Sequence, residues 1–244
     1  MKKFLLIILA IMVVAVVAFF IYDESMPQGT AGPDAEALAE KMLDAVNAEA
    51  WKEIPYVGWS FRGAHHYVWD KENHISQVVW DDYEAVIDLN TVTGRAKKAG
   101  KDLQGEELEE AIQTAWAYWC NDSFWLNAPV KANDPGTSRK IVKDDDGKDQ
   151  LLIQYESGGV TPGDAYLWQL DENFRPVSYK MWVSIIPVGG IKATWEKWVE
   201  KDGALVSTMH KMGPMEIAIE NLKVGTSPAD FDLEGEYFTS ARSE

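Results

Sequence analysis

Histidine and cysteine are the residue types of this chain that could carry out chemistry. The histidines are His65, His66, His74 and His210, and the one cysteine is Cys120. His65 and His66 are neighbours on an expected strand, so they point to opposite faces and cannot hold one metal ion together. Cys120 stands between aromatic residues in WAYWCND, which indicates a buried and unreactive thiol. We therefore expect no metal, no cofactor and no catalytic residue.

Known catalytic and metal-binding motifs are missing from the sequence. It contains no G-x-S-x-G, H-E-x-x-H, G-x-x-x-x-G-K-[ST] or C-x-x-C pattern. The acidic run Asp144–Asp146 lacks the alternating acids of a calcium loop, and a solvated turn is the better interpretation.

Aromatic residues are the remaining candidates for a site, because 11 of the 244 residues are tryptophan. A cavity lined by such side chains would bind apolar ligands by burying their surface. The alternative is a side-chain core that fills the same space. The predicted ligand-binding residues are Trp59, Phe61, His65, Tyr67, Trp69, Trp80, Tyr179, Met181 and Trp195.

Composition and charge exclude several classes of protein. The chain carries 23 basic and 39 acidic residues, a net charge of −16, which argues against nucleic-acid binding. With 46% hydrophobic and 25% charged residues it is a folded protein, neither disordered nor a polytopic membrane protein. A single cysteine allows no disulfide within the chain.

The N-terminal segment indicates export. Lys2 and Lys3 precede residues 4–22, nineteen residues without a charge, followed by Asp23. Nineteen helical residues span about 28 Å, enough to cross a bilayer. A cleaved signal peptide is the alternative, with a shorter apolar region. We expect an uncleaved, single-pass anchor in the inner (cytoplasmic) membrane, with the rest of the chain on the periplasmic side.

Two helices are expected from apolar residues that recur every three or four positions. The first spans 34–51 and the second 106–120. A period of two predicts a half-buried strand over 57–70, and further strands over 75–80 and 83–89. Residues 91–105 are expected to form a polar loop.

The second half is predicted to be almost entirely strand. Short connections with D-G and P-G signals make these strands antiparallel neighbours. The expected strands are 138–142, 151–156, 165–170, 175–186, 191–200, 204–210 and 215–222.

The predicted fold class is α+β. About ten antiparallel strands must curl into a half-barrel, with the two helices packed against its apolar face. The predicted parts are the signal anchor (1–22), a flexible tether (23–33), the half-barrel domain (34–224) and a polar C-terminal tail without an element of its own (225–244).

The order of these elements resembles the LolA/LolB-like superfamily of lipoprotein carriers in the bacterial cell envelope. The resemblance rests on the helix 34–51, the strand 58–70, the segment Phe124-Trp125-Leu126 with Pro129, and the later strands, and not on a diagnostic motif. It implies an apolar cup for acyl chains. The expected membrane anchor departs from the carriers proper, and no functional residue of the family can be matched here.

Three functions are compatible with these patterns. The favoured one is a membrane-anchored binding protein for a lipid, acyl chain or other apolar molecule, and not an enzyme. The second is a cell-envelope module that docks a protein partner without a ligand. The third, least favoured, is an enzyme that pairs His65 or His66 with a carboxylate inside the cup.

Overall fold

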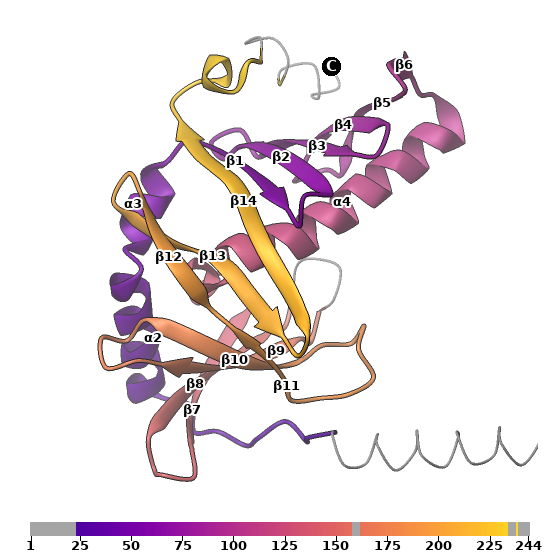
Figure 1. The fold of residues 1–244 in the computed structure, drawn as a ribbon. Coiled ribbons are helices and arrows are strands. Elements are labelled where there is room, and N and C mark those ends of the chain that lie inside the picture. Colours follow the sequence, from indigo (N-terminus) through magenta and orange to yellow (C-terminus); the bar gives the residue numbers. More distant parts are fainter. Residues whose placement is uncertain (1–22, 158–161, 234–237, 239–244) are drawn as a thin grey trace, which may run out of the picture.

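The computed structural model describes residues 23–157, 162–233 and 238. Their elements combine helices with antiparallel sheets, so the expected α+β class is confirmed (Figure 1). The helices are α2 (Pro33–Ala45), α3 (Ala48–Glu53), α4 (Gly105–Asn127) and the 3₁₀ helices η1 (Ala128–Lys131) and η2 (Pro228–Phe231). Within the described residues, no helix is long and apolar enough to cross a membrane. The predicted anchor, residues 4–22, lies outside them.

The larger sheet has nine antiparallel strands, in the order β12-β13-β14-β1-β2-β3-β4-β5-β6. These strands are β12 (Glu196–Lys201), β13 (Ala204–Met212), β14 (Met215–Gly225), β1 (Tyr56–Phe61), β2 (His65–Asp70), β3 (Ile75–Trp80), β4 (Tyr83–Asp88), β5 (Thr93–Lys98) and β6 (Lys101–Asp102). The pairing of β1 with β14 brings the first and last strands of the chain together within this sheet.

The smaller sheet has five antiparallel strands, in the order β11-β10-β9-β8-β7. These strands are β11 (Ile191–Thr194), β10 (Pro176–Trp182), β9 (Ala165–Leu170), β8 (Asp149–Tyr155) and β7 (Thr137–Lys143). Helix α2 packs against β7 and β8, and α4 contacts β4, β5 and β13 of the larger sheet.

The single half-barrel sheet of about ten strands is a prediction that needs correction. The described residues form fourteen strands in two sheets, and neither sheet closes into a barrel. The cause is local, because the expected strand 191–200 breaks at Trp195. Strand β11 before the break pairs with β10, whereas β12 after it pairs with β13. Trp195 is therefore the corner at which the chain changes sheets.

The predicted helix 34–51 is two helices. Apolar residues of α2, among them Leu38 and Met42, are buried as expected. Asn47 then adopts a left-handed conformation with φ 52°, and its side chain accepts a hydrogen bond from the Ala50 N–H at 3.3 Å. Its amide also donates to the Gly203 carbonyl oxygen at 2.9 Å. These contacts end α2 and begin α3, because asparagine tolerates this conformation and caps helices.

The predicted strand 57–70 is a hairpin of β1 and β2. The chain turns at Arg62 and Gly63, both with positive φ. Phe61 pairs with His65 across this turn, and Trp59 pairs with Tyr67. Paired residues share a face of the sheet, so the predicted aromatic face exists although the strand is interrupted.

Further boundaries differ from the prediction, among them that of the expected strand 175–186, which ends as β10 at Trp182. Helix α4 continues seven residues beyond the predicted end at Cys120, to Asn127. Residues 93–98 form strand β5 and not a loop, since β5 pairs with β4 along its whole length. Gly94 permits this close pairing: a Cβ atom there would lie 2.0 Å from the Val86 carbonyl oxygen.

The segment predicted as a flexible tether is packed against the smaller sheet. Thr30 forms an antiparallel bridge with Ile141 of β7, with main-chain hydrogen bonds of 2.9 and 2.8 Å. Met26 packs against the cluster of Leu152 and Leu167. Pro and Gly among polar residues predicted a flexible segment, because the composition does not show the contacts that this segment makes with the smaller sheet.

The C-terminal tail, predicted to lack an element, contains η2. Phe231 of η2 packs on Tyr56, with ring centroids 6.4 Å apart, and Gly58 leaves the space for its ring. Phe238 is buried beside Ile75. The described tail residues therefore cover one face of the larger sheet.

Candidate functional site

Six of the nine predicted site residues lie on β1, β2 and β3, against α4. Trp59 and Tyr67 stack with ring centroids 4.5 Å apart. His65 stacks on Tyr118 of α4 at 4.0 Å. These contacts between rings fill the space in front of the sheet. The six residues are Trp59, Phe61, His65, Tyr67, Trp69 and Trp80.

The other three lie where the two sheets meet. Tyr179 and Met181 come from β10, and Trp195 stands at the corner between β11 and β12. The Trp195 ring centroid is 5.2 Å from that of Trp168 and 4.3 Å from that of His210. Eight of the nine residues, all except His65, thus belong to one hydrophobic core, in which they form two groups. Buried members are Trp59, Phe61, Tyr67, Trp80, Tyr179, Met181 and Trp195.

Four buried polar atoms in and beside the second group make no hydrogen bond within the described chain. They are the Tyr155 and Tyr179 hydroxyls and the Nε1 atoms of Trp168 and Trp195. Burial raises the pKa of both tyrosines well above the ordinary value. Each buried donor without a partner costs about 1–3 kcal/mol. The interior therefore has hydrogen-bonding capacity that the described chain does not use.

A buried carboxylate connects the first group to α4. Asp122, 1% exposed, accepts hydrogen bonds at Oδ2 from Tyr67 at 2.5 Å and from His65 Nδ1 at 2.6 Å. Asn121 donates to its Oδ1 at 2.7 Å. Burial raises the pKa of the Asp122 carboxyl, and the hydrogen bonds from Tyr67, Asn121 and His65 oppose this rise. The hydrogen bonds of His65 and Tyr67 to Asp122 join β2 to α4.

Sequence reasoning missed Asp122, since the second helix was expected to end before it. The signal was its spacing: Ala115, Trp119, Asp122 and Leu126 recur at intervals of four, three and four. An acid within an apolar helical stripe requires a partner on the facing element. His65, one of the nine predicted residues, is that partner.

The other potential reactive groups are held in local contacts. The Ser60 hydroxyl and His66 Nδ1 lie 2.8 Å apart on the opposite face of the sheet, as the alternation predicted, and Asn221 donates to Ser60 at 3.1 Å. Burial raises the pKa of the Cys120 thiol to about 12, so the thiol stays protonated at neutral pH. No group of three metal-binding side chains occurs among the described residues.

An open groove of about 650 Å³ lies elsewhere, between the start of α2 and the smaller sheet. Its apolar lining includes Leu38 of α2, Ile141 of β7, Leu170 of β9 and Phe174 of the following turn. The charged residues that line it are Lys41, Lys143, Lys148, Asp34, Asp149 and Asp171. None of the nine predicted residues belongs to its described lining.

The lysines of the groove are ordered by neighbours. Lys41 Nζ lies 4.7 Å from the centroid of the Phe174 ring. Lys143 and Asp149 form an ion pair at 2.6 Å, and Lys148 donates to the Leu170 carbonyl oxygen at 3.0 Å. Three lysines and three aspartates balance, so the groove is close to neutral in a chain of net charge −16.

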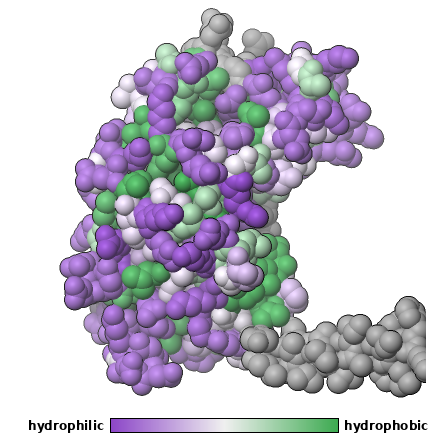
Figure 2. Space-filling model, in the orientation of Figure 1, coloured by the Kyte–Doolittle hydropathy of each residue, from purple (hydrophilic) through white to green (hydrophobic). Residues whose placement is uncertain are grey.

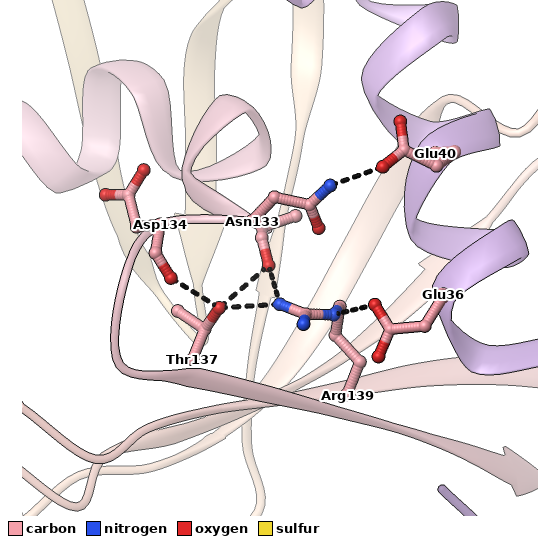
Figure 3. Close-up of polar contacts among 7 residues, drawn as sticks. Glu36, Glu40, Asn133, Asp134, Thr137 and Arg139 are labelled. Atoms are coloured by element: carbon pink, nitrogen blue, oxygen red, sulfur yellow. Dashed lines mark hydrogen bonds and ion pairs between the residues drawn. The ribbon is translucent and has the colours of Figure 1, made fainter. Parts of the chain in front are cut away.

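Polar contacts hold α2, one wall of the groove, in place (Figure 3). Arg139 of β7 donates through Nε to Glu36 of α2, and through Nη1 to Thr137 at 2.7 Å. Asn133 donates to Glu40 one turn further along α2, at 2.5 Å. The contacts to α2 come from Arg139 of β7 and from Asn133 between η1 and β7, so the wall is fixed from one side.

Comparison with known proteins gives a structural likeness only. No known protein family and no curated protein matches the sequence. The structure is similar to the crystal structure of a DUF1329 family protein from Desulfovibrio piger ATCC 29098, with a TM-score of 0.41 and 13% identity. The match covers 84% of this chain and 96% of that chain. The relation to the LolA/LolB-like superfamily therefore stays a resemblance in the order of elements.

Proposed function

We propose that the chain is an exported, membrane-anchored protein that binds a lipid, acyl chain or other apolar molecule and releases it unchanged. The observation that carries the proposal is the open groove between α2 and the smaller sheet. Its volume of about 650 Å³ lies within the range of about 300–1,000 Å³ that is typical of small-molecule sites.

The lining of the groove supports an apolar ligand. Leu38 and Leu170 belong to the main hydrophobic core, so the lining of the groove is continuous with the core. Burying about 200 Å² of an acyl chain there would contribute about 5 kcal/mol before entropic costs. The balanced charges at the groove suit an uncharged or singly charged head group better than a polyanion.

The aromatic interior is a second candidate for the ligand site. The specific observation in its favour is the set of buried donors without partners at Tyr155, Trp168, Tyr179 and Trp195. A ligand there would have to displace side chains that now contact one another. The groove requires no such displacement, and we favour it for that reason.

Binding without turnover is part of the proposal. His65 and Asp122 lie in the geometry of an acid–base pair, but both are already engaged, with Tyr67 and Asn121 as further partners of the carboxylate. The arrangement of His65 and Asp122 suits a structural link between β2 and α4. Substitution of His65 by glutamine is therefore expected to leave ligand binding unchanged.

Replacing Phe174 with asparagine tests the groove. Phe174 adopts φ 62°, a conformation that asparagine tolerates, so the substitution removes the ring without straining the turn. Full-length protein in nanodiscs would be irradiated with a diazirine-labelled fatty acid, and cross-linked peptides identified by mass spectrometry. We expect the wild type to be labelled on peptides from 30–41 and 141–149, and the variant to lose most of this labelling.

Val177 is the matched control. It is 37% exposed against 36% for Phe174, and it does not belong to the described lining of the groove. Val177→Asn should keep the labelling of the wild type. Labelling concentrated on peptides around Trp168 and Trp195 would move the site to the aromatic interior. Equal losses in both variants would contradict the groove as the site.

A further inference from the structure

The loop between β10 and β11 is an apolar surface at one end of the smaller sheet. Residues 181–191 contain no charged side chain, in a chain that is 25% charged. Ile185 is 71% exposed, the largest exposed fraction among the exposed large hydrophobic side chains of the described residues. Figure 2 shows hydrophobic residues gathered at this edge of the molecule.

The first described residues are attached to this same loop. The Asp23 carboxylate accepts a hydrogen bond from the Gly189 N–H at 2.9 Å, and the Glu24 N–H donates to the Gly189 carbonyl oxygen at 3.2 Å. Trp182 Nε1 donates to the Glu24 carbonyl oxygen at 2.6 Å, and Lys180 forms an ion pair with the Glu24 carboxylate at 2.6 Å. These four contacts fix the start of the domain beside the loop.

Glycine makes this attachment possible. A Cβ atom at Gly189 would lie 2.4 Å from the Trp182 ring and 2.5 Å from the Glu24 carbonyl oxygen. At Gly190, φ is +76° and a Cβ atom would lie 2.6 Å from the Glu24 Cβ. Only a residue without a side chain permits so close an approach.

Because of this attachment, no free linker residues separate the apolar segment from the domain. Asp23 is the first charged residue after the nineteen apolar residues 4–22. A free tether of eleven residues could hold the domain about 36 Å away from the bilayer. Because Asp23 and Glu24 are bound to the loop, a segment that ends at residue 22 in the bilayer places the loop at the bilayer surface.

We propose that the β10–β11 loop docks on the lipid bilayer, with Ile185 and its apolar neighbours inserted among the lipid head groups. This inference rests on the proposed anchoring of residues 4–22. Loop chemistry fits the interface, where apolar side chains are buried and an indole such as Trp182 is favoured. Lys192 follows the uncharged stretch and suits the phosphates of lipid head groups, whereas Lys180 before it is paired with Glu24.

Fluorescence quenching in vesicles tests this docking. Full-length protein would carry Cys120→Ala together with either Ile185→Cys or Val177→Cys, labelled with the fluorophore NBD. Both positions are exposed and apolar, and Val177 lies near the start of β10 whereas Ile185 lies in the loop after its end. Each protein would be reconstituted into vesicles of phosphatidylethanolamine and phosphatidylglycerol that contain spin-labelled lipid. We expect the label at position 185 to lose most of its fluorescence and the label at position 177 to keep it.

Other outcomes would contradict the docking or the anchoring of the protein. If neither label is quenched while the protein resists an alkaline wash of the vesicles, the anchor holds and the docking is wrong. If both labels are quenched alike, the domain lies on the membrane without a preference for the loop, and the inference fails. If the alkaline wash releases the protein, the anchoring fails, and this inference fails with it. As a control, a cooperative thermal unfolding transition would show that each labelled protein is folded.

Discussion

Replacing Asp122 with alanine is expected to lower the free energy of unfolding by about 3–5 kcal/mol. The change removes the shared acceptor of Tyr67 and His65, and Tyr67 is only 2% exposed. Water cannot reach the Tyr67 hydroxyl easily, so its lost hydrogen bond is not replaced. Urea denaturation of wild type and variant, followed by circular dichroism, measures the difference.

Two further variants show whether burial is the cause. Asp149→Ala removes a carboxylate that is 47% exposed and pairs with Lys143, so a loss below about 1 kcal/mol is expected. Asp122→Asn keeps one acceptor oxygen but turns an amide group toward a neighbouring donor, so its loss should fall between the two. A loss for Asp122→Ala no larger than that for Asp149→Ala would contradict the proposed role of the buried carboxylate.

The second large effect is a loss of stability in mild acid, caused by His210. This residue is fully buried, and its Nδ1 lies 3.0 Å from the Thr194 carbonyl oxygen. Burial lowers the pKa of His210 to about 4, although the Thr194 and Trp125 main chain and the Glu196 charge oppose this shift. The folded state therefore favours the neutral ring.

The sign of the pH dependence follows from this lowered pKa. The stabilisation by neutral His210 is complete above about pH 6.5, the pKa of an unperturbed histidine, and is lost as the pH falls toward about 4. The loss over this interval is about 3 kcal/mol. The raised pKa of Asp122 acts in the opposite direction, because its protonation is easier in the folded state.

Variants of His210 and of an exposed histidine show whether His210 causes the loss of stability in acid. His210→Asn, which keeps a donor near the Thr194 oxygen, should be less stable than the wild type at pH 7.5 and should lose less stability toward pH 4. His74→Asn changes an exposed histidine with φ 55° and should keep the pH profile of the wild type. A His210→Asn profile parallel to that of the wild type would contradict the buried histidine as the cause.

Periodicity in the sequence predicted most of the secondary structure. The stripe on α2 and the alternation on β1 and β2 depend on neighbours within one element, and such patterns are local. Phe61 and His65 kept their common face because the hairpin turn joins them as a cross-strand pair. The break of strand 191–200 at Trp195 has no local signal, since it depends on two different partner strands.

The groove could not be predicted from the sequence, because its walls come from separate parts of the chain. Leu38, Ile141 and Phe174 share no periodic pattern, and only the packing of α2 on the smaller sheet brings them together. The aromatic residues that composition singled out form the core beside it. Their role as ligand contacts stays a prediction, as does the location of the protein in the membrane.

The attachment of residues 23–30 was hidden for a similar reason. Pro, Gly and polar residues indicate a linker, but the partners that hold this one, such as Gly189 and Ile141, are more than a hundred residues away. Binding of the chain start to the β10–β11 loop depends on tertiary structure alone.

Native mass spectrometry of the full-length protein, purified from a host that inserts envelope proteins, shows whether the protein carries an apolar ligand. Collisional release from detergent, combined with lipid extraction of the same sample, would show what the protein carries. We expect a stoichiometric lipid or other apolar molecule on the wild type and its loss from Phe174→Asn. A ligand-free mass, together with no labelling of the groove by the diazirine-labelled fatty acid, would contradict this expectation and favour a protein partner.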